Sequence, residues 1–314
     1  MLNQNKNVGI SSLPSGLERL LNDYREHCVH DGIKGSSIAL YLKEDIWFLQ
    51  NLYSVGCGGA EQINDVRVAA ACLALKSNSY LSTIKTFLRF LADAGYTAHD
   101  YSYVVPPYKR PQPIPSVYST AEICSVEAAA HDFSKRDYAV LLLATRLGIR
   151  SGDIAVLSFD TVDFNADVIR LVQQKTNAAI ELPLLPEIKS ALKDYIRNER
   201  PKCDSPHIFL NQEPPHNHIS IMLIGKIVRR NLIKAGVEIG GRSQGPHAFR
   251  SSLASSMVND SVPYEIVRKT LGHIDKNAIK SYARLNVEQL RPYALDIPEA
   301  SAGFADFLAG KAVL

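Results

Sequence analysis

Residues 245–285 read GPHAFRSSLASSMVNDSVPYEIVRKTLGHIDKNAIKSYARL, and their pattern predicts three short consecutive helices. Pro246 follows a glycine and suits the first position of a helix, where the missing N–H has no intrahelical partner in any case. In a helix that begins there, His247 and Arg250 are three residues apart and share one face. Two cationic or proton-exchanging side chains can therefore point at one ligand.

The second and third helices of this stretch add two more polar side chains. Residues 262–271 follow a helical pattern, and Gly272 is a natural C-terminal stop because glycine readily adopts the left-handed conformation. Asp275 can cap a third helix, which carries Tyr282. Because His273 lies between these two helices, an imidazole and a phenol follow the first helix along the chain.

The order H-A-F-R, then L-G-H, then a tyrosine nine residues after that histidine resembles the C-terminal signature of the tyrosine recombinases, the phage integrase family. Upstream, L-L-L-A-T-R-L-G-I-R-S-G-D-I-A-V-L is similar to the first-arginine box of that family, with Gly148 and Arg150 on its signature positions. Asp153 stands where the box usually carries an acidic residue, and Gly152 where a serine is common. Q-Q-K-T-N then puts Lys175 where the catalytic lysine of the family falls.

The resemblance implies that the Tyr282 oxygen attacks a DNA phosphodiester and forms a 3′-phosphotyrosyl bond. Charge spreads over the non-bridging oxygens in the transition state, so fixed cations aimed there stabilise it. Arg150 and Arg250 are assigned this role, because a guanidinium binds two oxygens and keeps its charge. His247 and His273 can donate to the same oxygens, or exchange a proton with the attacking hydroxyl, since imidazole titrates near neutral pH.

The leaving 5′ oxygen needs a proton, and Lys175 can deliver it as a general acid if neighbouring cations lower its pKa. Two arginines and a lysine perform the charge stabilisation otherwise given to a divalent ion, so we expect no metal, no other cofactor and no ATP. Each residue alone has an ordinary alternative: a packing tyrosine, a structural histidine, a helix-capping arginine or a solvent-facing lysine. The order and spacing of all six favour the catalytic interpretation.

Composition is that of an ordinary globular protein, with 46% hydrophobic and 21% charged residues in a chain of 314 residues, long enough for two domains. The net charge of +3 does not by itself indicate nucleic-acid binding. No apolar run approaches a membrane span and the polar start lacks a secretory pattern, so we expect a cytoplasmic protein of a bacterial-type cell, associated with the nucleoid when it acts. The five scattered cysteines have no paired metal-ligand spacing, which favours reduced thiols.

Three segments and a tail are expected along the chain. Apolar residues recur at helical spacing in residues 13–103, which predicts a small helical bundle. Residues 104–117 contain five prolines and are expected to be a linker. Residues 118–297 mix helices with a three-stranded antiparallel sheet, with Lys175 on or near a hairpin tip. The expected class is mainly α with a small antiparallel sheet, and the resemblance makes it a two-domain DNA clamp with a core-binding and a mixed α+β catalytic domain.

Polar and cationic residues on helix faces and in the linker are candidates for contacts with DNA phosphates, which fix register without reading bases. A solvated or solubilising role is the alternative for each of them. The candidates are Thr83, Lys85, Thr86, Arg89, Lys109, Arg110, Lys226, Arg229 and Arg230.

Residues 298–314 carry Phe304, Phe307 and Leu308 at helical spacing, and so short a helix must dock on something. Its own domain is one choice; the resemblance favours a neighbouring protomer, because related enzymes exchange C-terminal helices around a ring. The resemblance also implies a homotetramer on two double-stranded DNA recombination sites and exchange through a Holliday junction, with accessory DNA-bending proteins as further candidate partners. The rival interpretations are a type IB topoisomerase and a catalytically silent DNA-binding protein on the same fold.

Overall fold

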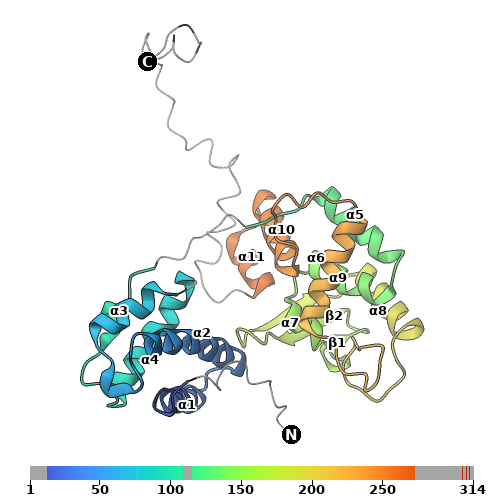
Figure 1. Ribbon diagram of the computed structural model, residues 1–314. Helices are drawn as coiled ribbons and strands as arrows, with labels where there is room; N and C mark the ends of the chain where they lie inside the picture. The colour runs from blue at the N-terminus through green and yellow to red at the C-terminus, as the bar shows by residue number, and fades with distance from the viewer. Residues whose placement is uncertain are drawn as a thin grey trace. The chain divides into compact units, whose positions relative to one another are not determined.

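The computed structural model describes residues 13–75, 77–108 and 115–272, together with residues 306, 309 and 311. The chain divides into two compact units, Met1–Gln112 and Pro113–Leu314 (Figure 1). Each unit has a hydrophobic core of its own. The predicted class, mainly helical with a small antiparallel sheet, is confirmed.

The first unit is a helical bundle. Apolar residues spaced three and four apart form one stripe on each helix, and these stripes meet in the core. On the last helix, for example, Ile84, Phe87 and Leu91 are fully buried. Within the described residues, the α-helices of this unit are α1 (Ser15–His30), α2 (Gly35–Ser54), α3 (Asp65–Leu73) and α4 (Leu81–Asp93).

Thr83 on α4 faces inward, which contradicts its predicted contact with DNA. Its side chain is buried, and its hydroxyl donates a hydrogen bond of 2.6 Å to Glu44 on α2. A buried carboxylate requires such a partner. Thr83 therefore lies at the edge of the buried stripe of α4, although its polar side chain had suggested the solvent-exposed face.

The second unit surrounds a helix that is apolar on almost every side. This helix, α6, is buried from Ala139 to Ala144, and α5, α8 and α10 pack against it. No helix in the described part of the chain has the length and apolar character needed to cross a membrane. The helices are α5 (Thr120–His131), α6 (Lys135–Arg146), α7 (Ser151–Ala155), α8 (Pro186–Asn198), α9 (Ile221–Lys234), α10 (Pro246–Asn259) and α11 (Tyr264–Leu271).

The sheet of the second unit has three antiparallel strands in the order β1 (Val162–Asp163), β2 (Val168–Val172) and β3 (Ala179–Pro183). Alternation along β2 buries Ile169 and Leu171. The same alternation turns Gln173, one residue beyond the strand, toward the interior, where it is 1% exposed. Lys175 lies in the turn between β2 and β3, as the sequence predicted.

Candidate active site

Arg150 follows a turn that strongly favours glycine. It is the residue before the first turn of α7, and Gly148, two residues earlier, has a φ of +60°. A Cβ atom at Gly148 would lie 2.9 Å from Leu271 Cδ2 and 3.1 Å from Leu253 Cδ2. The turn is therefore pressed against α10 and α11, which brings Arg150 to the end of α11.

Arg250 reaches the same place from the first turn of α10. Its side chain is 3% exposed. Its Nη1 donates to the carbonyl of Gly148 at 2.6 Å, and its Nη2 donates to the carbonyl of Leu271. The Arg250 guanidinium thus fastens the turn before Arg150 to the end of α11.

Gln173 joins the two sides of this arrangement, although we did not single it out in the sequence. Its Nε2 donates to the carbonyl of Leu271 at 3.1 Å, and its Oε1 accepts from Arg150 Nη1 and from Thr176 Oγ1, the latter at 2.8 Å. A Cβ atom at Gly272 would lie 2.5 Å from the Gln173 amide, so the left-handed glycine that ends α11 also makes room for it. The period of two along β2 is the signal that could have identified Gln173 as buried.

The two guanidinium groups meet at successive carbonyl groups of the backbone. Arg250 donates to Leu271, and Arg150 Nη2 donates to Gly272 at 3.4 Å. These carbonyls close the C-terminal end of α11, where the partial negative charge of a helix favours cations. Two permanent positive charges, fixed by backbone and by a buried amide, are therefore placed side by side.

His247 lies in the first turn of α10 with much of its side chain open to solvent. Its pKa is lowered from the usual 6.5, first because the surrounding protein partly desolvates the charged ring, then because Arg250, Lys175 and Arg150 are close. Protonation of His247 is thus opposed by the same cations that the sequence assigns to the site. Three of the other predicted catalytic residues are therefore within electrostatic reach of His247.

Lys175 is exposed at its turn, and Asp153 anchors that turn. The Asp153 side chain is 4% exposed, and its Oδ1 accepts from the backbone N–H of Gln174 at 2.8 Å. Asp153 Oδ2 has no hydrogen-bond partner among the described residues. One turn of α7 therefore links Arg150 to the hairpin of Lys175. A Cβ atom at Gly152 would meet Gln174 Oε1 at 3.5 Å, an ordinary contact.

His273 and Tyr282 lie outside the described residues, so their positions stay predictions. His273 directly follows Gly272, whose carbonyl accepts from Arg150. Within the described part of the chain, no group of three or more His, Cys, Asp and Glu residues could hold a metal ion.

The candidate DNA contacts fall into distinct environments. On α4, Thr86 and Arg89 are exposed and Lys85 is partly exposed; on α9, Lys226 and Arg229 are exposed. Lys109 and Arg110 lie outside the described residues.

Arg230 is engaged within the protein. It pairs with Asp137, whose side chain is fully buried, and its guanidinium lies 4.4 Å from the ring centroid of Phe133. We infer that its charge balances a buried carboxylate, and that Lys226 and Arg229 on the same helix are better candidates for DNA.

Comparisons with known proteins identify one family. The model of the phage integrase family matches residues 118–289. In Sinorhizobium fredii (strain NBRC 101917 / NGR234), y4rF, named for an integrase/recombinase, is 36% identical over 227 residues, which are 70% of this chain and 53% of y4rF. A second relative from the same organism, y4gC, is also named for an integrase/recombinase. It is 33% identical over 189 residues, which are 59% of this chain and 97% of y4gC. This chain therefore spans about half the length of y4rF and nearly all of y4gC.

A solved structure supports the same fold. The crystal structure of a lambda integrase tetramer bound to a Holliday junction matches with a TM-score of 0.67 and 16% sequence identity, over 89% of this chain and 82% of that one. At this identity the likeness concerns the fold alone.

Proposed function

Because this chain belongs to the phage integrase family, we propose that it is a site-specific DNA recombinase that cleaves and rejoins DNA through a 3′-phosphotyrosyl bond on Tyr282. One observation carries the proposal: Arg150 and Arg250, far apart in the sequence, donate to the adjacent carbonyls of Gly272 and Leu271. Paired guanidinium groups suit an anion with two exposed oxygens, such as a backbone phosphate.

The pair acts on the phosphorane-like transition state. Negative charge grows on the non-bridging oxygens as the tyrosine oxygen attacks, and preorganised cations stabilise it without reorganising. The carbonyl groups and the Gln173 amide hold the planes of both guanidinium groups before DNA arrives. Part of the cost of orienting them is therefore met during folding.

Proton transfer is assigned to His247 and Lys175. A lowered pKa keeps the His247 imidazole neutral near pH 7, so that it can accept the proton of the attacking hydroxyl or pass it on. Lys175 protonates the leaving 5′ oxygen from its turn, and Asp153 sets the start of that turn. His273 is proposed as a further donor to the phosphate. The chemistry uses neither a metal, nor another cofactor, nor ATP.

The proposed working unit is a homotetramer on two double-stranded recombination sites, which exchanges strands through a Holliday junction. The shared fold with a lambda integrase tetramer on such a junction supports this assembly. We assign residues 13–103 to the core-binding domain, 104–117 to the linker, 118–297 to the catalytic domain and 298–314 to a tail helix exchanged between protomers. The protein would act in the cytoplasm, on the nucleoid, with any DNA-bending partner depending on the site.

A nicked suicide substrate from the native locus tests the reaction. Loss of the short fragment after cleavage prevents rejoining, so a covalent adduct should accumulate, and peptide mapping should place the DNA on Tyr282. Products that join two different duplexes would distinguish a recombinase from a type IB topoisomerase, which relaxes DNA in one duplex. No adduct with any substrate, together with sequence-specific DNA binding, would point to a catalytically silent protein.

Deletion of residues 299–314 tests the tail. A tail exchanged between protomers predicts impaired assembly on DNA while the thermal unfolding of the monomer is unchanged. Assembly equal to that of the full chain would remove the exchange.

A further inference from the structure

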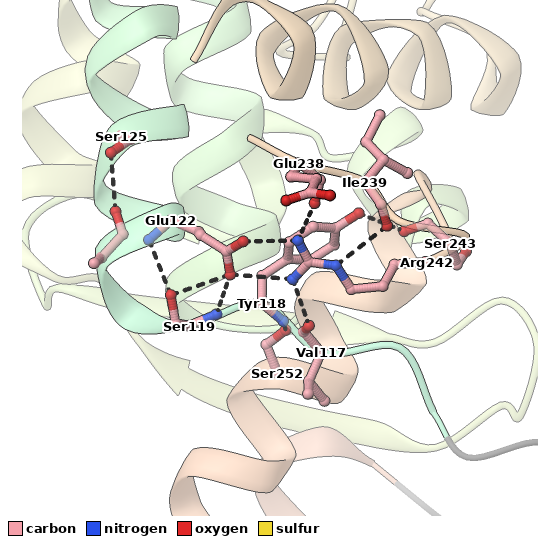
Figure 2. Close-up of polar contacts among 11 residues, drawn as sticks. Val117, Tyr118, Ser119, Glu122, Ser125, Glu238, Ile239, Arg242, Ser243 and Ser252 are labelled. Carbon is pink, nitrogen blue, oxygen red and sulfur yellow. Dashed lines mark hydrogen bonds and ion pairs between the residues drawn. The ribbon is translucent and has the colours of Figure 1, made fainter. Parts of the chain in front are cut away.

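The loop before α10 leads directly into the first turn of that helix. Residues 238–245 form neither helix nor strand, and α10 begins immediately after them at Pro246. Side-chain contacts join this loop to parts of the second unit that are distant in the sequence (Figure 2).

Arg242 supplies most of these contacts. Inside the loop it donates to the carbonyls of Glu238 and Ile239. Across to the start of α5 it forms a two-pronged pair with the Glu122 carboxylate, with Nη1–Oε2 at 3.1 Å and Nη2–Oε1 at 2.7 Å. Its Nη1 also donates to the carbonyl of Val117 at 3.1 Å. One guanidinium thus joins the loop to the segment that leaves the proline-rich stretch.

Tyr118 completes the connection. Its ring lies 4.3 Å from the Arg242 guanidinium, and its hydroxyl donates to the carbonyl of Ser243 at 2.9 Å. Its backbone N–H donates to Ser252 Oγ on α10 at 2.8 Å, and its ring packs beside Phe249. Tyr118 therefore contacts both the loop and the helix that the loop precedes.

Glu122 has two functions in this cluster. It accepts from the backbone N–H and the hydroxyl of Ser119 in the capping box of α5, and it accepts both prongs of Arg242. These bonds, the one from Arg242 first, lower the pKa of the Glu122 carboxyl to about 2. The carboxylate is thus charged throughout the physiological range, and the beginnings of α5 and α10 are held to one another.

We propose that Arg242 is a positioning residue: with Tyr118 and Glu122 it forms a clasp that fixes the first turn of α10, and with it His247 and Arg250, against the end of the linker segment. The inference rests on the proposed recombinase function, because its consequence is the rate of DNA cleavage. A lysine cannot reproduce the fork, so R242K should loosen the loop while preserving the charge. A movement of the linker end should be passed to α10 through the same contacts.

The test compares R242K with R146K as a matched control. Arg146 makes a similar two-pronged pair with Glu127, at 3.0 and 2.6 Å, on α5 and α6. NMR titration of the His247 ring in the protein without DNA should show its pKa moving toward the usual value in R242K and unchanged in R146K. Single-turnover cleavage of the suicide substrate should fall about tenfold in R242K, with its Kd for DNA changed less than about twofold, because a small misplacement of catalytic groups costs rate.

The clasp would be overturned if the wild type cleaves DNA and R242K shows the same cleavage rate and the same His247 titration. If the wild type forms no adduct, the recombinase proposal fails instead, and the titration still decides whether Arg242 positions His247. Should R242K not fold, Tyr118→Phe removes only the bond to the Ser243 carbonyl. Tyr118→Phe should change the His247 pKa and the cleavage rate in the same directions as R242K, by smaller amounts. If it changes neither, the clasp is contradicted as well.

Discussion

Replacement of Gln173 by leucine should impair the function of Arg150 although Arg150 itself is unchanged. Gln173 is 1% exposed, and its amide links Arg150, Thr176 and the carbonyl of Leu271. Leucine has a similar volume and leaves little cavity, but it can neither accept from the guanidinium nor donate to the carbonyl. The variant therefore removes the contribution of Gln173 to the orientation of Arg150 and keeps the charge of Arg150.

The size of the effect follows from the bonds that are lost. A hydrogen bond to a charged group contributes about 1.5–3 kcal/mol, and a neutral one about 0.5–1.5 kcal/mol. The Leu271 carbonyl keeps its bond from Arg250, and Thr176 is only partly buried and can turn to water. We expect the free energy of unfolding to fall by about 2–3 kcal/mol. Cleavage should slow by about a hundredfold, since misplaced groups near the reacting atoms cost that much.

Denaturant unfolding and single-turnover cleavage measure the two quantities separately, and DNA affinity is measured by anisotropy. Gln212→Leu is the matched control, because Gln212 is exposed and its amide, within the described part of the chain, donates to the carbonyl of Glu199 at 3.4 Å. It should leave stability and rate unchanged. A Gln173→Leu protein with the rate of the wild type would refute the role of this amide in orienting Arg150.

Three further outcomes are expected. Gly148→Ala should lower the free energy of unfolding by about 2–4 kcal/mol in denaturant titrations, because a left-handed backbone and contacts of 2.9 and 3.1 Å oppose a Cβ there. Lys175→Gln should slow cleavage far more than it weakens DNA binding, and a variant that changes neither would pass the general-acid role to another residue. His247 has a folded pKa below its unfolded value of 6.5, so it costs stability as pH falls through 6.5. His247→Gln should reduce the acid loss of stability, and an unchanged pH profile would contradict the lowered pKa.

The parts of the site that follow from local rules could be predicted from the sequence. A glycine with a left-handed backbone precedes Arg150, a proline starts the helix of His247 and Arg250, and a hairpin turn carries Lys175. Each of these depends on residues within a few positions along the chain. The resemblance to the family adds that these residues act together on one phosphate, which local rules cannot show.

The features that the sequence did not reveal depend on partners that are far away along the chain. Thr83 looked solvent-facing because its acceptor, Glu44, lies on another helix. Arg230 looked like a DNA contact because Asp137, which it neutralises, is 93 residues away. The alternation along β2 could have shown that Gln173 is buried, but not that its amide donates to the carbonyl of Leu271, 98 residues away. A polar residue at the edge of a stripe has no local signal that tells a buried partner from water.

The central claim is that Arg150 and Arg250 stabilise the negative charge of one phosphate. A substrate whose scissile phosphate is replaced by a methylphosphonate lacks one of the charged oxygens and tests this directly. Arg150→Ala and Arg250→Ala should each slow cleavage of the normal phosphodiester by about 10²–10³-fold, yet lose much less against the methylphosphonate. Use of the same variant on both substrates cancels any loss through misfolding. Equal losses on the two substrates would contradict the account.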